Sequence, residues 1–212
     1  MLRAAVVPLA FVLNHNHPRA RSHLGPGESG WSFPGGGAKE VLVLASPIGP
    51  DQLRFTHVSR LAFFTFGILH EPVDHPQNAS FLETVGEVFA HAGQADGFLW
   101  ASEGTEGYVL PSLAGDQESK VAQTLTLWRD LDSVRHFAYH GPHAGALRRR
   151  RDWFAGGSWP GFVAWWVPDG TYPTWSEAAR RLEHLNDNGP TAEGFTFNAA
   201  FDQTGRAITR RG

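Results

Sequence analysis

The sequence predicts an α+β fold in which an antiparallel sheet carries helices on one of its faces. Three observations predict it. Runs rich in β-branched and aromatic residues recur along the chain, and segments with apolar residues at helical spacing lie between them. Clusters of glycine, proline and acidic residues separate the two kinds of segment, as turns do.

The first half of this pattern supplies two longer strands, two short strand candidates and a helix. Residues 61–69 are a nearly continuous apolar run, which is typical of a strand covered on both faces. Apolar side chains then recur every three or four residues over 81–92, as in an amphipathic helix. Short strands are expected at 98–101 and 108–110, and period-two alternation predicts a longer strand over 121–128.

A second helical segment follows the strand at 121–128. Asp130 or Asp132 can cap its first turn, because a short side-chain oxygen accepts hydrogen bonds from free backbone N–H groups there. Gly141 and Pro142 interrupt the segment, since proline lacks an N–H donor and disfavours helix at the preceding residue. We therefore expect a broken helix that restarts at His143.

A last strand and a last helix complete the pattern. Residues 162–167 form an apolar strand, and Thr174 with Glu177 is a capping-box start for a helix that runs to about residue 185. From residue 61 to 167 the order is strand, helix, strand, strand, helix, strand, which is the βαββαβ pattern of ferredoxin-like folds. With helices on one face, the other face is left for a partner or a ligand.

The chain divides into three parts on composition. Residues 1–57 are a loop-rich N-terminal extension, punctuated by glycine and proline, with one short strand at 41–45. Residues 58–200 form the main domain, and 201–212 are expected to be a flexible tail.

Composition limits the kinds of function. The formal charge of -3 gives no field that would gather nucleic acid or an anionic membrane, so we expect neither as a partner. The absence of cysteine excludes disulfides, thiolate metal sites and cysteine nucleophiles. No apolar run approaches membrane-spanning length, and a cytoplasmic location is the expectation. A small hydrophobic molecule is the expected partner.

His143 and Arg150 are the candidate catalytic residues. On a regular helix that advances roughly 100° per residue, Leu147, Arg150 and Phe154 share a narrow sector with His143. Two basic groups would then lie on a buried stripe, where an unpaired charge is costly. Either they are an internal ion pair and a core histidine, or His143 is a general base, donor or axial ligand while Arg150 holds an anionic oxygen.

A metal site is not expected. His136, His140 and His143 have spacings of four and three residues, which would align three imidazoles on one unbroken helix. The Gly-Pro pair interrupts that helix, and no glutamate follows His136 as the zinc-protease motif requires.

Aromatic residues crowd the same region and suit a flat hydrophobic ligand. Adjacent strand residues point to opposite faces, so only one of Trp165 and Trp166 can line a cavity. The residues expected to bind the substrate are Phe64, Phe66, Trp128, His140, Leu147, Phe154, Trp165 and Trp166.

From Leu61 to about Phe197 the chain resembles the uncharacterised-domain family 3291, in the dimeric α+β barrel superfamily that includes antibiotic-biosynthesis monooxygenases. The segments that carry the resemblance are Phe66-Gly67, Gly97-Phe98-Leu99-Trp100, Leu127-Trp128, Asp132-Ser133-Val134, Phe137-Ala138-Tyr139, His143, Arg148-Arg149-Arg150-Arg151-Asp152-Trp153-Phe154, Trp165-Trp166-Val167-Pro168, Gly189-Pro190-Thr191 and Phe195-Thr196-Phe197.

The resemblance implies a homodimer in which two ferredoxin-like subunits pair their sheets into a barrel, each with a pocket between sheet and helices. Relatives include cofactor-free monooxygenases, cyclases, isomerases and haem proteins. Many members of the family have an asparagine before the Phe-Gly pair of the first strand, where this chain has Thr65.

We therefore expect a biosynthetic enzyme that oxygenates, cyclises or isomerises an aromatic or polyketide-like substrate without a cofactor. His143 would be the base or donor and Arg150 the oxyanion or carboxylate clamp. One alternative is a haem protein with His143 as axial ligand and Arg150 near a propionate. Another is a non-catalytic ligand-binding accessory protein.

Overall fold

The computed structural model describes residues 59–103 and 107–209, so the predicted extension at 1–57, with its strand at 41–45, lies outside the described residues. An antiparallel sheet of four strands forms the centre of this part of the chain, in the order β2-β3-β1-β4. Its strands are β1 (Ser59–Ile68), β2 (Phe98–Ala101), β3 (Val121–Trp128) and β4 (Phe162–Pro168).

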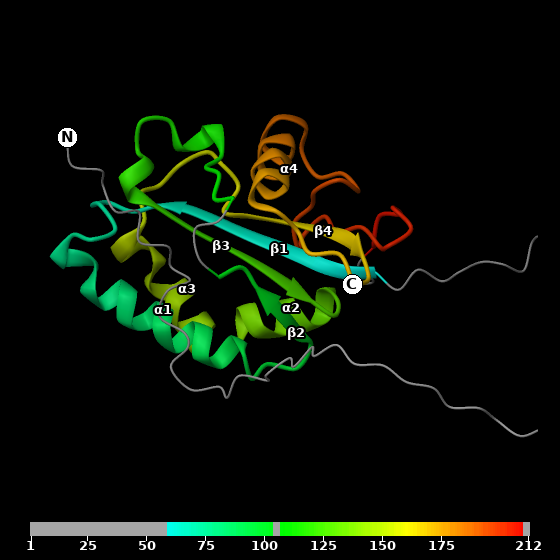
Figure 1. The fold of residues 1–212 in the computed structure, drawn as a ribbon, viewed down its shortest axis with the longest axis horizontal. Helices are drawn as coiled ribbons and strands as arrows, with labels where there is room; N and C mark the ends of the chain where they lie inside the picture. Colours follow the sequence, from blue (N-terminus) through cyan, green and yellow to red (C-terminus); the bar gives the residue numbers. More distant parts are fainter. Residues whose placement is uncertain (1–58, 104–106, 210–212) are drawn as a thin grey trace, which may run out of the picture. The chain divides into compact units, whose positions relative to one another are not determined.

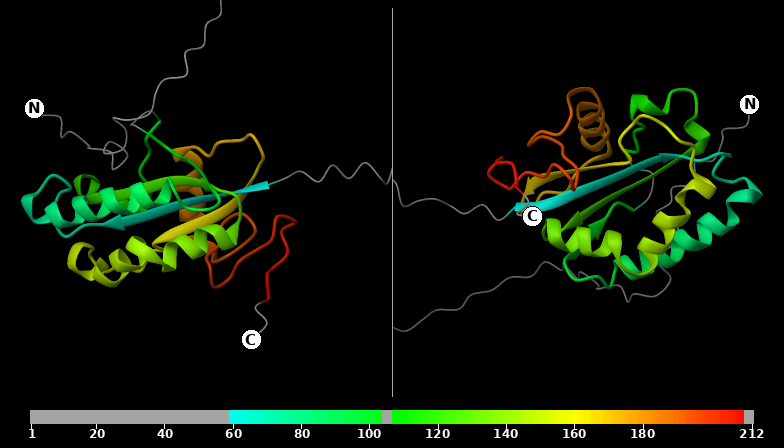
Figure 2. Two further views of the ribbon diagram at one scale, coloured as in Figure 1. Left: turned by 90° about the horizontal axis from the view of Figure 1, so that it is seen from below. Right: turned by 180° about the vertical axis from the view of Figure 1, so that it is seen from behind.

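Four α-helices cover the two faces of this sheet. They are α1 (Ala79–Ala92), α2 (Leu131–Tyr139), α3 (Gly141–Trp153) and α4 (Trp175–Asn188), and short 3₁₀ helices precede α1 and β3. Figures 1 and 2 show α1, α2 and α3 on one side of the sheet and α4 on the other. Among the described helices, none has both the length and the apolar composition that a bilayer crossing requires.

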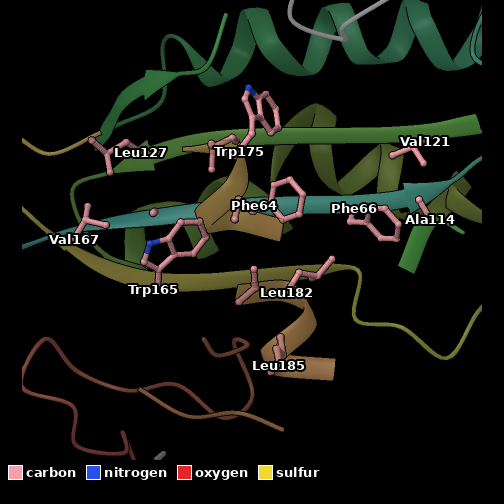
Figure 3. Packing of buried hydrophobic residues seen from close by; sticks show 14 of the residues in the cluster. Phe64, Phe66, Ala114, Val121, Leu127, Trp165, Val167, Trp175, Leu182 and Leu185 are labelled. Atoms are coloured by element: carbon pink, nitrogen blue, oxygen red, sulfur yellow. The ribbon is translucent and has the colours of Figure 1, made fainter. Parts of the chain in front are cut away.

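The expectation of helices on one face only was therefore wrong. Successive β1 side chains point to opposite faces, and both sets are apolar. Phe64 and Phe66 pack with Trp175 and Leu182 on the α4 side, as Figure 3 shows. Leu61 and Phe63 pack on the other side, in a cluster that also contains the α2 residues Leu131, Val134 and Ala138. A strand that is apolar on both faces needs two covers, and α4 is the second.

Residues 107–117 add to the cover on the α4 side. Tyr108 and Leu110 were predicted to be in a strand, but this segment forms a loop that packs against the α4-side cluster. The amide of Gln123 donates a hydrogen bond to the Val109 carbonyl over 3.0 Å, and a carboxylate oxygen of Glu183 accepts one from the Ser112 N–H over 2.6 Å. The loop is thus held to both β3 and α4.

The predicted break between α2 and α3 is confirmed, although α3 restarts at Gly141 and not at His143. Asp130 caps α2 by accepting a hydrogen bond from the Ser133 N–H at 2.8 Å. His140 then adopts an extended backbone, and Gly141 has a φ of +57°, a conformation that glycine adopts without strain. The second helix consequently starts in a new direction.

Residues 201–208 hold a hydrogen-bonded turn where the sequence predicted a loose tail. The carboxylate of Asp202 accepts hydrogen bonds from the Thr204 and Arg206 N–H groups, and the Ile208 N–H returns to the Ala200 carbonyl. Short polar side chains that bond to nearby backbone are typical of such turns.

Candidate functional site

The residues predicted to line one cavity lie on both faces of the sheet. Phe64 and Trp165 have no exposed surface and Phe66 has 4%, and all three belong to the α4-side core. Trp128 is 1% exposed and packs on the side of α2. The prediction of a shared wall was wrong because the strand register places Trp128 opposite Leu61, on the other face of the sheet from Phe64.

His143 is half-buried in the first turn of α3. Its Nδ1 lies 2.8 Å from the Ala138 carbonyl oxygen, and since a carbonyl can only accept, Nδ1 carries the hydrogen. Burial lowers the pKa of His143 below its ordinary value of 6.5, and the hydrogen bond to Ala138 opposes this to a lesser degree. The neutral ring therefore has an unprotonated Nε2, and no described residue forms a hydrogen bond with it.

Phe137 is the centre of an aromatic group around His143. Its ring centroid lies 5.1 Å from that of His143 and 5.0 Å from that of Trp128. The ring of His91, in the last turn of α1, stacks on Phe137 at 6.0 Å. Gly141 lies against His91, because a Cβ at this glycine would be 3.0 Å from His91 Nε2. The apolar ring of Phe137 thus packs against the imidazole, which contributes to its desolvation.

His140 and His136 lie in solvent, so the prediction that His140 lines the site was wrong. Their rings stack at 4.2 Å, and His140 Nδ1 bonds to the His136 carbonyl oxygen at 2.8 Å. His143 points elsewhere because the helix restarts in a new direction at Gly141. Within the described ranges, no group of three or more histidine, aspartate or glutamate side chains could hold a metal ion.

Arg150 is exposed, and the prediction of a buried stripe containing it was wrong. Among the residues that the structure describes, its guanidinium donates only to the Leu147 carbonyl oxygen in its own helix, at 3.2 Å. The helix ends at Trp153, which is 4% exposed and packs with Ala146 one heptad earlier. Phe154 lies beyond the end of α3, so the burial of its ring does not show which side of the helix faces the core.

Phe154, Leu147 and Trp166 are half-buried in separate surroundings. The Phe154 ring covers Gly67 of β1, where an added Cβ would lie 2.6 Å from two of its atoms. The indole N–H of Trp166 donates to the Phe201 carbonyl at 2.8 Å. Trp166 packs on the α2 side of the sheet and Trp165 on the α4 side, as the alternation rule requires.

A pair of threonines lies in the middle of the sheet on the side of α1, α2 and α3. Thr65 of β1 and Thr124 of β3 are partners in the strand register, and their hydroxyl oxygens are 2.7 Å apart. Both are half-buried, whereas Leu61 and Phe63 on the same face of β1, and Leu69 just after the strand, are buried. Thr124 was missed because only the strand register places it beside Thr65.

Two packing contacts between the sheet and helices α2 and α3 lie on either side of the threonine pair and of His143. At one end, α2 packs on Leu61 and Phe63; at the other, Trp153 of α3 packs in a cluster with Leu69. The threonine pair lies between these anchors along the sheet, and His143 lies between them along the two helices. The threonine pair and His143 therefore lie between the same two packing anchors, the pair on the sheet and the histidine on the helices.

Comparison with known proteins identifies the family. The family described as "Domain of unknown function (DUF3291)" matches residues 60–211, and the chain belongs to it. No curated protein matches the chain. The crystal structure of the NE2512 protein of unknown function from Nitrosomonas europaea is similar at 12% identity and a TM-score of 0.38, over 56% of this chain and 98% of that one. A likeness of this size adds nothing to the description of the site.

Proposed function

We propose that this member of the DUF3291 family is a small-molecule enzyme in which His143 removes a proton from a hydrophobic, aromatic or polyketide-like substrate. One observation carries the proposal: Nδ1 of a half-buried histidine is committed to a backbone carbonyl, so Nε2 is left as a free base. The lowered pKa keeps this base unprotonated at neutral pH.

The surroundings support an apolar substrate with one polar oxygen. The ring of Phe137 supplies aromatic surface beside the imidazole, and the buried Trp128 packs against Phe137. Thr65 and Thr124 share one hydrogen bond, which uses one of their two hydroxyl hydrogens. The second hydrogen is free to bind a substrate oxygen. We assign the developing oxyanion to this pair instead of to Arg150, because the Arg150 guanidinium lies in solvent.

Proton removal is the step common to the reactions expected from the sequence. A carbanion formed beside a carbonyl can attack a second carbonyl and close a ring, or take back the proton at another carbon. It can also react with dioxygen, which is the route of cofactor-free oxygenation. His143 supplies the base in each case, and none of them requires a bound cofactor.

A haem-binding role is the second candidate, and the same histidine favours it. An axial histidine commonly donates its other ring N–H to a backbone carbonyl, as His143 does to Ala138. His143 would be the residue that holds the iron. Titration of the full chain with haemin tests this role, which predicts a Soret band that is lost in His143→Gln.

The ferredoxin-like arrangement and the homodimer also belong to this proposal. The strand order β2-β3-β1-β4 supports the first, together with the placement of α1 and α2–α3 on one face. Helix α4 covers the sheet face that a barrel partner would use, so we propose that a second copy pairs through another surface. Light scattering of the full chain gives the mass of the assembly.

The experiment compares full-length wild type with His143→Gln, using His140→Gln as a matched control on the exposed side of the same helix junction. Anthrone and benzoylacetone serve as probes, because each has a carbon acidified by neighbouring carbonyl and aromatic groups. Deuterium uptake and oxygen addition are followed by mass spectrometry.

We expect wild type and His140→Gln to react at similar rates and His143→Gln to lose about 100-fold, a typical contribution of a general base. Retention of the wild-type rate by a folded His143→Gln variant would overturn the role of His143. A wild-type rate equal to that in buffer for both probes would overturn the substrate class.

A further inference from the structure

Besides Trp165 Nε1, three polar groups on the α4 side of the sheet have no hydrogen-bond partner among the described residues, and the proposed function does not use them. Gln123 Oε1 and Trp175 Nε1 are buried without a hydrogen bond, and each residue is only 5% exposed. No described residue bonds to the hydroxyl of Tyr108, which burial and the nearby Glu118 carboxylate keep protonated by raising its pKa to about 12. Buried polar groups in folded proteins are nearly always satisfied, by protein, water or ligand.

These groups belong to one neighbourhood. Gln123 is the register partner of Phe66, and its amide holds the Val109 carbonyl, next to Tyr108 in the chain. The ring of Tyr108 meets that of Trp175 edge-on at 5.2 Å. An acceptor and two donors therefore lie between β3, the start of α4 and the loop of residues 107–117.

Aromatic rings enclose the neighbourhood. Trp175 also meets Phe64 at 6.2 Å, and Phe66 meets Trp159 at 6.3 Å, both edge-on. Tyr108 and Trp159 are half-buried, so solvent reaches the edge of the group while its centre is buried. Apolar walls with a few convergent polar atoms are the usual composition of a small-molecule site.

We propose that this neighbourhood is a second binding site, on the sheet face opposite His143, for a small aromatic molecule that carries a hydroxyl group. A hydroxyl accepts a hydrogen bond from Trp175 Nε1 and donates one to Gln123 Oε1, which is the pair of functions that the two buried atoms lack. The aromatic ring packs edge-on against Tyr108, Phe66 and Trp159. The site does not depend on the chemistry proposed for His143.

A matched pair of tryptophans allows a direct test. Trp165 Nε1 is also buried and unpartnered, but Figure 3 shows its indole nitrogen pointing away from Trp175, toward Val167. Trp175→Phe and Trp165→Phe therefore remove the same N–H group and retain a ring, one inside the proposed site and one outside it. Spectra of the variants also assign the two indole N–H signals.

The experiment titrates full-length protein with phenol, and with toluene as the probe of equal shape without a hydroxyl, while ¹H–¹⁵N spectra record the indole N–H signals. Phenol should shift the Trp175 signal in a saturable way, and toluene should bind at least five-fold more weakly. Trp175→Phe should weaken phenol binding about five-fold, as expected for one hydrogen bond, with Trp165→Phe within two-fold of wild type.

Three results would overturn the proposal. The first is that phenol at millimolar concentration does not shift the Trp175 signal and a long-lived water is detected at this N–H. Bound water would then satisfy both Trp175 Nε1 and Gln123 Oε1. The second is equal binding of phenol and toluene. The third is equal loss of phenol affinity in the two variants, which would assign the effect to general loosening of the core.

Discussion

The hydroxyl of Thr126 gives a stability prediction that can be worked out from individual contacts. Thr126 Oγ1 donates to the Phe63 carbonyl at 3.1 Å and accepts from Trp128 Nε1 at 2.9 Å. Trp128 is 1% exposed, so water cannot replace the lost acceptor. Thr126→Val keeps the shape of the side chain but leaves the indole N–H buried and unpaired.

An unpaired buried donor costs about 1–3 kcal/mol, and the lost bond to Phe63 adds about 1 kcal/mol, so we expect a loss of roughly 2–4 kcal/mol in the free energy of unfolding. The matched control is Thr124→Val, because Thr124 lies two residues before Thr126 on the same face of β3. Its hydroxyl bonds to the half-buried Thr65, which water can reach, so this variant should lose less than about 1 kcal/mol.

Urea unfolding followed by circular dichroism measures both variants, with stability taken from the midpoint at constant slope. The reasoning is refuted if Thr126→Val lies within about 0.5 kcal/mol of wild type, or if the two variants lose the same amount. Because Trp128 packs on Phe137 and Phe137 on His143, the Thr126 variant should also move the His143 ring signals.

Three further predictions concern the same face of the sheet. The folded state holds the pKa of His143 below 6.5, so the unfolded chain binds the proton more readily and the free energy of unfolding should fall as pH drops through 6.5. The His143→Gln variant should show a weaker dependence on pH. Urea midpoints measured between pH 5 and 8, in roughly half-unit steps, test both statements. Gly67→Ala places a Cβ 2.6 Å from the Phe154 ring and should cost about 1–3 kcal/mol in the same assay, whereas no loss would mean that the ring moves freely. Asp130→Ala removes the oxygen that accepts from the Ser133 N–H and should cost about 1 kcal/mol, with unchanged stability contradicting the cap.

The sequence was sufficient for the longer strands and helices because their signals are local. Alternation over 121–128 and the capping pair Thr174 and Glu177 each predicted an element that the structure contains. The run at 61–69 also indicated a strand covered on both faces, and the helix beginning after Thr174 supplies the second cover. The prediction of one bare face failed because the sequence does not say on which face a later helix packs.

The candidate site was predicted only in part, and the errors have geometric causes. The inward orientation of His143 follows from its place in the first turn of α3. Arg150 was predicted to face inward because it shares a helical sector with Phe154, which was counted as part of the helix. The helix ends one residue earlier, and its last buried side chain is Trp153. Thr124 and Gln123 could be placed only once the register of β3 against β1 was known.

The protonation of His143 tests the central claim most directly. Long-range ¹H–¹⁵N correlation spectra of the histidine rings in the full chain, recorded across a pH series, report which ring nitrogen carries the hydrogen and where the ring titrates. The claim predicts hydrogen on Nδ1, a bare Nε2 at neutral pH and a pKa below the ordinary 6.5. Hydrogen on Nε2, or a pKa at or above that value, would contradict it.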